Sequence, residues 1–442
     1  MVVKFVDLFS GIGGFHAVAS ILDWQVAYAC DIDTRARNIY EANWNFKPAE
    51  DITQDATKNV MKVPKHDVLF AGFPCQPFSK SGKQNGMDEA RGTLFWNIAR
   101  ILEERKPKMI LLENVPNLAG PRHRHEWEVI IRTLRSLNYR VSEQPFIISP
   151  HRLNRDSGGR PQNRPRIYIG ATYVPSHMQK RFSLYAESLD VSSLKPDNIT
   201  SYWNLVSDIQ IDRKIKKSQQ VKLTLNDQEL YWLETWQELL DKFPIVEGES
   251  RLPGFPIWAD VWLGNIKLKK TDPVWKRDFV LKNLDFYERN KRRIDSWLNR
   301  NRDLENFPTS RRKFEWQAGD QISIFDCLIQ LRPSGIRVKR PNYAPSVVAI
   351  TQTSIVGKLL RRLSPQEVAQ LQGLPSWFSF GEQSDSISYR QLGNGISVGA
   401  AYQTLRALVI RDEQILKTTC PEIFDSVSNS PQNPDLRLSQ LG

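Results

Sequence analysis

The chain has 442 residues, of which 40% are hydrophobic and 25% are charged, and its net charge is +12. A chain of this length can bury a full core over about two or three lobes, and its positive charge favours a polyanionic partner. No apolar run is long enough to span a membrane and the four cysteines have no paired spacing, so we expect no membrane segment, signal peptide, disulfide framework or zinc cluster, and a cytosolic location.

Residues 1–170 are predicted to alternate strands and helices. KFVDLF is a short apolar strand, and a glycine-rich turn and the helical segment FHAVASILD follow it. Further strands are predicted in QVAYACDID, HDVLFAGFP, PKMILLENV and RPRIYIGATYV, and helices in TRARNIYEAN and TLFWNIARILEER. Near-continuous apolar runs are typical of strands that are covered on both faces. The alternation predicts an α/β fold with a doubly wound, Rossmann-like sheet, which collects ligands at the carboxyl ends of its strands.

Residues 171–345 have few clear periodicities and are predicted to form a separate domain of irregular structure. Eight of the thirteen tryptophans lie between positions 203 and 316, where we expect most of them to fill a core. Four basic clusters occur there: RKIKK at 213–217, KLKK at 267–270, KRR at 291–293 and RRK at 311–313. Each cluster alone is typical of a solvated face, and together they can neutralise phosphates.

Regular elements are expected again in residues 346–442. PSVVAIT is predicted as a strand and LSPQEVAQLQGLP as a helix, in which Ser364 is the N-cap and Glu367 completes a capping box. The segment RQLGNGISV predicts a tight Gly-Asn-Gly turn before another helix. The residues after about 420 are rich in Ser, Asn and Pro, which predicts a loose tail.

The segment DLFSGIGGF directly follows the first predicted strand. Gly11 and Gly13 let the backbone turn sharply and approach a ligand at the start of a helix. The pattern alone is equally typical of a plain tight turn, and it has neither the dinucleotide spacing nor a phosphate-binding P-loop. Asp31, at the end of the next strand, could accept hydrogen bonds from a ribose, and Asp51 from an adenine amino group. Together these residues favour a cofactor that carries a nucleoside.

Cys75 lies in GFPCQPFS, where a predicted buried strand ends. A lone cysteine is ordinarily a small buried hydrophobe. Pro74 and Pro77 make this strand exit stiff, which is a poor place for a core residue and favours a nucleophile. The polar segment SKSGKQNGMDEARG that follows is either a surface loop or a lid that closes over substrate.

Three further residues carry candidate chemistry. Glu113, in ENV, follows the apolar run MILL, and burial would raise its pKa so that it could hold or donate a proton near neutrality. Arg164 and Arg166 alternate along the predicted strand of PQNRPRIYIG, so we expect them to share one face. They could bind phosphate, orient Glu113 or contact a base oxygen, and a structural salt bridge is the simpler alternative.

In this order, the segments closely resemble the blocks of the cytosine-5 DNA methyltransferase family, of the bacterial restriction–modification type. DLFSGIGGF resembles the cofactor loop, PCQ the nucleophile block, ENV the acid block and QNRPR the block of glutamine and arginines. RRLSPQEVAQLQGLP and RQLGNGISV resemble the two C-terminal blocks. The resemblance covers roughly residues 1–170 and 345–410. It implies a methyltransferase sheet that uses S-adenosylmethionine, and a target recognition domain in residues 171–345.

The resemblance also implies a mechanism. The target cytosine leaves the duplex, because its reacting atoms are inaccessible while it is stacked. The thiolate of Cys75 adds to carbon 6, Glu113 assists at ring nitrogen 3, and carbon 5 then becomes nucleophilic enough to accept the methyl group. Loss of the proton on carbon 5 expels the cysteine. Arg166 is implied to contact the cytosine oxygen and to support Glu113, and Arg164 to shape the pocket.

The same resemblance implies the binding residues. Cofactor contacts are implied for Phe9, Gly11, Gly13, Asp31, Ile32, Asp51, Ile52 and Asn394, and DNA contacts for Gln76 and Ser79. Double-stranded DNA is the implied partner of a monomeric, nucleoid-associated enzyme with no metal, and a cognate restriction endonuclease is a further expected partner. Two departures stand out, since the ribose acid is more often Glu in this family and Pro165 separates the two arginines. Asp33 could share the role of Asp31, and Pro165 favours an edge strand.

Three alternatives stay open at this point. A tRNA cytosine methyltransferase could be built on the same domain, although the long middle region suits duplex reading. An inactive DNA-binding regulator could retain the fold, although Cys75, Glu113 and Arg166 are intact. A cysteine hydrolase would need a histidine base, and none of the six histidines lies in a matching motif.

Overall fold

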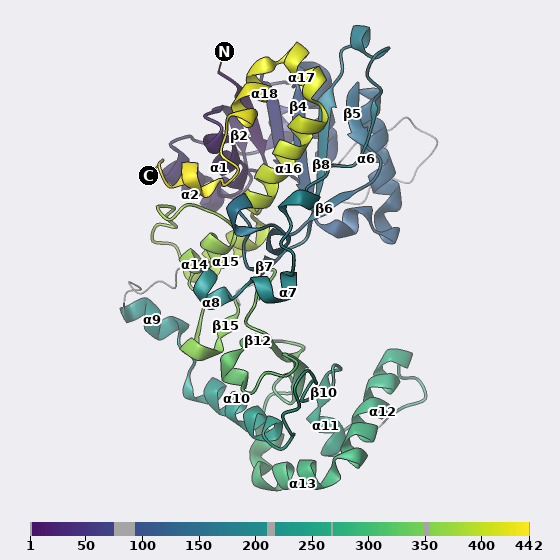
Figure 1. Ribbon diagram of the computed structural model, residues 1–442, viewed down its shortest axis with the longest axis vertical. Coiled ribbons are helices and arrows are strands. Elements are labelled where there is room, and N and C mark those ends of the chain that lie inside the picture. Colours follow the sequence, from purple (N-terminus) through teal and green to yellow (C-terminus); the bar gives the residue numbers. More distant parts are fainter. Residues whose placement is uncertain (1, 75–92, 210–216, 267, 348–352, 442) are drawn as a thin grey trace. The chain divides into compact units, whose positions relative to one another are not determined.

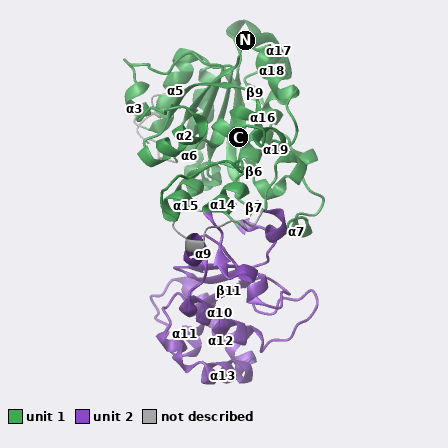
Figure 2. Cartoon of the chain, turned by 90° about the vertical axis from the view of Figure 1, so that its left-hand side faces the viewer, with its two compact units in different colours: residues 1–203, 345–351, 365–442 green, residues 204–344, 352–364 purple. Residues whose placement is uncertain are grey.

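The computed structural model describes residues 2–74, 93–209, 217–266, 268–347 and 353–441 (Figure 1). The chain forms two compact units (Figure 2). Unit 1 comprises residues 1–203, 345–351 and 365–442, and unit 2 comprises residues 204–344 and 352–364. The first unit therefore extends beyond residue 170, where the sequence places the domain boundary. It does so because strand β9 (Tyr185–Ala186) still pairs with the first sheet and Trp203 Nε1 donates a hydrogen bond to the His151 carbonyl.

Unit 1 is built on one mixed sheet with the strand order β2-β1-β3-β4-β8-β5-β9, and β6 pairs with β8. The bounds of these strands are β1 Lys4–Leu8, β2 Gln25–Cys30, β3 Val68–Gly72, β4 Met109–Asn114, β5 Tyr139–Ser142, β6 Phe146–Ile148 and β8 Arg166–Tyr173; β7 Gln162–Asn163 lies outside this sheet. The strands β2, β1, β3 and β4 are parallel, whereas β8 runs antiparallel to β4 and β5. The predicted α/β sheet is confirmed. The strand predicted in RPRIYIGATYV forms β8, which is the antiparallel strand next to β4.

Helices cover both faces of this sheet (Figure 1). Their bounds are α1 Gly14–Ile21, α2 Thr34–Trp44, α3 Ile52–Asp55, α5 Leu94–Arg105 and α6 Arg124–Ser136. Alternate residues of each strand face opposite layers, so that Val6 and Leu69 join the core formed with α5 and α6. On the other face, Phe15 of α1 stacks on Phe70 of β3 with ring centroids 4.9 Å apart.

The C-terminal part of unit 1 is helical. Its helices are α14 Pro365–Leu371, α15 Asp385–Asn394, α16 Val398–Arg411, α17 Glu413–Thr419, α18 Pro421–Ser428 and α19 Asp435–Leu438. The Gly-Asn-Gly segment forms the end of α15 and not the predicted tight turn, because Gly393 and Asn394 are still helical and Gly395 is the C-cap. The predicted strand PSVVAIT lies mostly outside the described residues.

The residues after 420 are ordered, in contrast to the loose tail that their composition predicts. Ile423 and Val427 are buried, one turn apart on α18. Ser426 accepts a hydrogen bond from Trp24 Nε1 at 2.9 Å, and Asp435 pairs with Arg160 at 2.6 Å. Apolar residues at helical spacing thus fix a segment whose overall composition is polar.

Unit 2 is more regular than its sequence predicts. Its sheet has the order β10-β11-β13-β12-β15-β16. The strands are β10 Ile257–Trp258, β11 Lys313–Gln317, β12 Leu328–Arg332, β13 Gly335–Lys339, β15 Ile355–Val356 and β16 Arg361–Arg362, and the longer helices are α10 Asp227–Leu240, α12 Val274–Arg289 and α13 Lys291–Arg300. Strands of two to five residues leave little periodicity in the sequence, which explains the difference.

Tryptophans fill the core of unit 2, as predicted. Trp236 stacks on Phe314 with ring centroids 4.7 Å apart and lies 5.2 Å from Trp297. The indole of Trp297 also donates to the Thr235 carbonyl at 2.8 Å, which satisfies its buried N–H. Among the described residues of the whole chain, no helix is long and apolar enough to cross a membrane.

Candidate active site and cofactor pocket

A pocket of about 420 Å³ opens where the parallel strands of unit 1 end. Phe9 follows β1, Asp31 follows β2, Pro74 follows β3, and Asn114 is the last residue of β4. Ligands of doubly wound sheets bind at this edge. Six of the predicted site residues line the pocket, namely Phe9, Gly11, Asp31, Glu113, Arg166 and Asn394. The structure therefore brings together the candidate cofactor loop and the candidate acid.

The loop after β1 has an unusual backbone conformation. Phe9, Gly11 and Gly13 have φ angles of 55°, 53° and 91°, all in the left-handed region. Glycine adopts this region without steric cost, whereas a phenylalanine there stores strain that the surroundings must offset. A Cβ added at Gly11 would have no atom within 4 Å, so the backbone there is open to a ligand.

Asp31 holds this loop. One carboxylate oxygen, Oδ2, accepts the Gly11 N–H at 2.7 Å, and Oδ1 accepts the Asp33 N–H at 2.8 Å. Burial raises the pKa of Asp31, and the two backbone N–H groups act in the opposite direction. Asp33 also lines the pocket, but its Oδ1 caps α2 through the amides of Arg35 and Ala36. Of the two acids, Asp31 is thus the one bonded to the glycine loop after β1.

The second pair of predicted cofactor residues lies differently. Hydrogen bonds from the side chain and backbone of Thr53 lower the pKa of Asp51, whose carboxylate caps α3. The side chain of Ile32 is 80% exposed, whereas that of Ile52 is 4% exposed and belongs to the core. Ile52 is therefore largely covered by protein and does not line the pocket, and its contact with adenine stays a prediction of the resemblance.

Glu113 and Arg166 form an ion pair in the pocket, with Arg166 Nε 3.0 Å from Glu113 Oε1. Glu113 comes from β4 and Arg166 begins the antiparallel neighbour β8. Burial raises the pKa of Glu113, and the charges of Arg166 and Arg164 partly oppose this rise. The carboxyl group is thus placed to hold a proton at a higher pH than an exposed glutamate, beside a fixed cation.

Arg164 plays a different part from Arg166, because the two do not lie on one strand. β8 begins at Arg166 and is an interior strand of the sheet, and Pro165 lies outside any strand and not on the predicted edge strand. Arg164 is 1% exposed, and it donates to the carbonyls of Val347 and Gly393, each at 2.8 Å, and of Gly395. Burial lowers its pKa to about 9, which leaves it charged at neutral pH.

Two of these bonds join the guanidinium of Arg164 to Gly393 and Gly395, the residues on either side of Asn394. Since Asn394 lines the pocket, Arg164 fixes the wall that the C-terminal block contributes. Its effect on the pocket is indirect, and Arg166 is the arginine that lines the pocket.

Asn114 has a structural role that the sequence pattern does not predict. Its Nδ2 donates to the Phe73 carbonyl at 2.8 Å, and its Oδ1 accepts the Val115 N–H at 2.8 Å. Asn114 therefore fixes the exit of β3 against that of β4, directly before Pro74 and Cys75 in the sequence. Its place in ENV, beside Glu113, is the one signal that could have indicated this role. Cys75, Gln76, Ser79 and the predicted lid lie outside the described residues.

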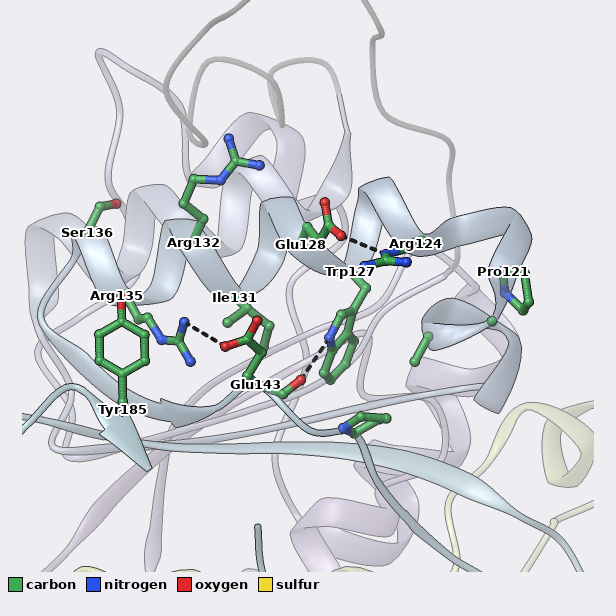
Figure 3. A pocket seen from close by; sticks show the side chains of 13 residues that line it. Pro121, Arg124, Trp127, Glu128, Ile131, Arg132, Arg135, Ser136, Glu143 and Tyr185 are labelled. Carbon is green, nitrogen blue, oxygen red and sulfur yellow. Dashed lines mark hydrogen bonds and ion pairs between the residues drawn. The ribbon is translucent and has the colours of Figure 1, made fainter. Parts of the chain in front are cut away.

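A larger pocket of about 1000 Å³ lies along α6 (Figure 3). None of the predicted site residues lines it. Arg124 points to Glu128 at 2.9 Å, and Arg135 to Glu143 at 3.7 Å, so that two of its cations are paired within the wall. Among the described residues, no group of three or more His, Cys, Asp or Glu side chains could hold a metal ion. The smaller pocket at the strand ends is the better candidate for chemistry.

Comparison with known proteins gives the family. The model of the C-5 cytosine-specific DNA methylase family matches residues 3–409. The chain is 42% identical to the Type II methyltransferase M.AluI of Cellulosimicrobium cellulans over 99% of this chain and 98% of that protein. It is 42% identical to M.HhaI of Haemophilus parahaemolyticus over 38% of this chain and 48% of that protein. A solved structure, the Dnmt2 methyltransferase of S. pombe, covers 93% of this chain and 99% of that chain at 16% identity and a TM-score of 0.48.

The fold, the pocket at the strand ends and the extent of the sequence matches define the class of protein. The chain belongs to the C-5 cytosine-specific DNA methylase family and is a DNA (cytosine-5) methyltransferase. The family that the sequence blocks resemble is thereby confirmed.

Proposed function

We propose that this enzyme transfers a methyl group from S-adenosylmethionine to carbon 5 of a flipped-out cytosine in duplex DNA, through a covalent adduct on Cys75. The observation that carries the proposal is the pocket of unit 1, in which the Glu113–Arg166 pair and the glycine loop of residues 9–14 share one cavity. Pro74 lines this cavity, and Cys75 is the next residue of the chain. The nucleophile, the acid and the bound methyl donor would then all lie next to the same base.

The residues of the pocket fit a nucleoside-bearing cofactor. The open backbone at Gly11, the carboxylate of Asp31 and the exposed side chain of Ile32 offer a close approach, a ribose acceptor and an apolar surface. Each oxygen of Asp31 already accepts one N–H, which leaves a lone pair on each for a ribose hydroxyl. The bound cofactor supplies an electrophilic methyl group.

The protein's own groups would prepare the base. Addition of the Cys75 sulfur to carbon 6 places negative charge on the ring, and a proton shared with Glu113 at nitrogen 3 would stabilise it. The raised pKa of Glu113 suits this task, since the carboxyl holds its proton more readily than an exposed one. Arg166 would orient the carboxyl and contact the cytosine oxygen from the same cavity.

Unit 2 is proposed to recognise the DNA, and two of its four basic clusters, RRK and KRR, differ in their surroundings, while most of RKIKK lies outside the described residues. In RRK, Arg312 pairs with Asp260 at 2.9 Å, and Arg311 donates to the Arg332 carbonyl. This cluster therefore serves the unit's own structure. In KRR, Lys291, Arg292 and Arg293 are exposed in the first turn of α13, which makes them the better candidates for phosphate contacts.

We further propose that the enzyme acts in the bacterial cytoplasm as the modification member of a restriction–modification system. The support is the near full-length similarity to a protein named a Type II methyltransferase. A cognate endonuclease would share its recognition sequence.

Transfer of labelled methyl groups from S-adenosylmethionine to duplex DNA or to tRNA tests the substrate. Incorporation into DNA alone is the expected result, and incorporation into tRNA alone would overturn the proposal in favour of an RNA enzyme. Bisulfite sequencing of DNA from cells that express the chain would then give the recognition sequence and the modified cytosine together. An absence of both activities would favour a regulator that retains the fold.

A further inference from the structure

We propose that Trp44 is a positioning residue whose indole N–H holds the glycine loop of residues 9–14 in the conformation that receives the cofactor. The inference rests on the proposed function and adds a residue to it. Trp44 is the last residue of α2, and its Nε1 donates to the Ile12 carbonyl at 3.0 Å. It does not line the pocket and would act only through the loop.

The indole is fitted closely to the loop. A Cβ added at Gly13 would lie 2.0 Å from Nε1 of Trp44 and 2.5 Å from its Cδ1. Only a residue without a side chain fits between the indole and the loop, and the φ of 91° at Gly13 independently favours glycine. At Gly11, by contrast, a Cβ would meet no atom within 4 Å. The loop is thus packed on the Trp44 side and open at Gly11.

Two residues hold the glycine loop, one just before helix α2 and one at its last position. Before its first turn, Asp31 accepts the Gly11 N–H at 2.7 Å, and at its last residue Trp44 binds the Ile12 carbonyl. The two bonds fix neighbouring backbone groups in opposite senses, one as donor and one as acceptor. They act on a segment in which Phe9 is itself in a strained conformation. Loss of either bond would let the loop relax away from the binding conformation.

Trp44 is in turn held rigidly by its neighbours. Its ring stacks on His16 of α1 at 4.8 Å and meets the ring of Trp377 edge-on at 5.3 Å. His16 is bonded to the Tyr40 hydroxyl at 2.7 Å, and burial lowers its pKa to about 3, so it is neutral. The indole therefore cannot turn to another acceptor without breaking these contacts.

The same end of α2 is joined to the segment between α14 and α15. Asn43, next to Trp44, donates to the Ser379 carbonyl at 2.8 Å and accepts the Ser379 N–H at 2.7 Å. The helix that follows this segment, α15, ends at Asn394, which lines the pocket. Trp44 thus contacts both the glycine loop and the segment that leads into α15.

The substitution Trp44→Phe tests the inference, because it keeps an aromatic ring in the stack and removes the N–H. Binding of S-adenosylhomocysteine to the full chain is measured by calorimetry, together with KM for S-adenosylmethionine and kcat on DNA. We expect Kd and KM to rise about 3- to 10-fold, the effect of one hydrogen bond, with kcat within about twofold. The matched control is Trp127→Phe, which removes an indole N–H bonded to the Glu143 carbonyl at 3.1 Å along α6 and should leave Kd unchanged.

A double-mutant cycle with Gly13→Ala tests the same contact from the side of the loop, with urea unfolding to check that each variant is folded, and Gly13→Ala alone still probes the contact if Trp44→Phe is poorly folded. The added methyl group should weaken cofactor binding strongly in the wild-type background and less beside the smaller phenylalanine, because the atoms it meets belong to the indole. Wild-type Kd in Trp44→Phe, or additive effects in the cycle, would overturn the inference while the proposed function stands. A wild-type chain that fails to bind the cofactor at all would instead overturn both.

Discussion

Arg166 Nε lies 3.0 Å from Glu113 Oε1, and the two residues come from antiparallel neighbouring strands at the mouth of one pocket. Strand pairing rather than loop geometry therefore sets this distance. The charge of Arg166 lowers the pKa of the Glu113 carboxyl and burial raises it, and burial has the larger effect. A carboxyl group in this position can share a proton with a ring nitrogen and remain oriented while it does so.

The first prediction concerns Glu113. Glu113→Gln keeps the shape of the side chain and removes its titration, so methyl transfer should fall by about 10²- to 10⁴-fold, the usual effect of losing a general acid. Binding of S-adenosylhomocysteine should stay near the wild-type value. The control is Glu128→Gln, which removes an exposed carboxylate that is also paired with an arginine, Arg124. Equal rates for both variants would exclude Glu113 from the reaction.

The second prediction separates the two arginines. Arg164→Met leaves the buried carbonyls of Val347 and Gly393 and the partly buried carbonyl of Gly395 without their donor, so the free energy of unfolding should drop by about 2–5 kcal/mol. Arg166→Met should cost less stability, because Arg166 is only partly buried, but it should lower the rate of methyl transfer about 100-fold or more. Urea unfolding and initial rates of both variants check this. A catalytic loss confined to Arg164→Met would reverse the assignment.

The third prediction concerns the surface of unit 2 that is proposed to bind DNA. Replacing Lys291, Arg292 and Arg293 by glutamine should weaken DNA binding and reduce the salt dependence of the binding constant, by about 0.9 in slope for each phosphate that the protein no longer neutralises. The matched control replaces three cations of the neighbouring helix that are paired with acids: Lys276, Lys282 and Arg289. Both triple variants remove the same positive charge. If their salt slopes are equal, the effect is one of net charge and the KRR cluster has no specific role.

The fourth prediction is a dependence of stability on pH. Burial, and then the charge of Asp31, raise the pKa of Asp7 well above its usual range. The folded chain therefore keeps a proton that the unfolded chain loses above about pH 4, so this carboxyl lowers the free energy of unfolding as pH rises. Asp7→Asn should gain stability relative to wild type between about pH 4 and pH 8. The exposed substitution Asp23→Asn should show no such gain, and a parallel response of the two variants would contradict the account.

Much of unit 1 could be predicted from the sequence, because its strands are long apolar runs that end in polar residues at one edge. That pattern places Asp31 and Glu113 at the strand ends, and both line the pocket there. The pattern fails where neighbours in sequence have different environments. Arg164 and Arg166 alternate as strand residues would, yet Pro165 separates a buried structural arginine from one that lines the pocket.

Burial and tertiary packing account for the other differences. Ile32 and Ile52 follow equivalent acids, but one is exposed and the other belongs to the core, which the local sequence does not distinguish. The segment after 420 has a polar composition, yet two buried residues one turn apart are enough to dock α18. The role proposed for Trp44 depends on contacts with segments far apart in the sequence, so no local sequence pattern predicts it.

The central claim is that Cys75 forms a covalent bond with the target cytosine, and a mechanism-based trap tests it most directly. Duplex DNA with 5-fluorocytosine at the methylated position cannot release the cysteine, because fluorine replaces the proton that must leave carbon 5. With S-adenosylmethionine present, wild-type chain should form a complex with this DNA that survives denaturation, and mass spectrometry should place the bond on Cys75. Cys75→Ala should form none. A wild-type chain that methylates the normal duplex but forms no adduct, or a Cys75→Ala variant that still methylates DNA, would contradict the account.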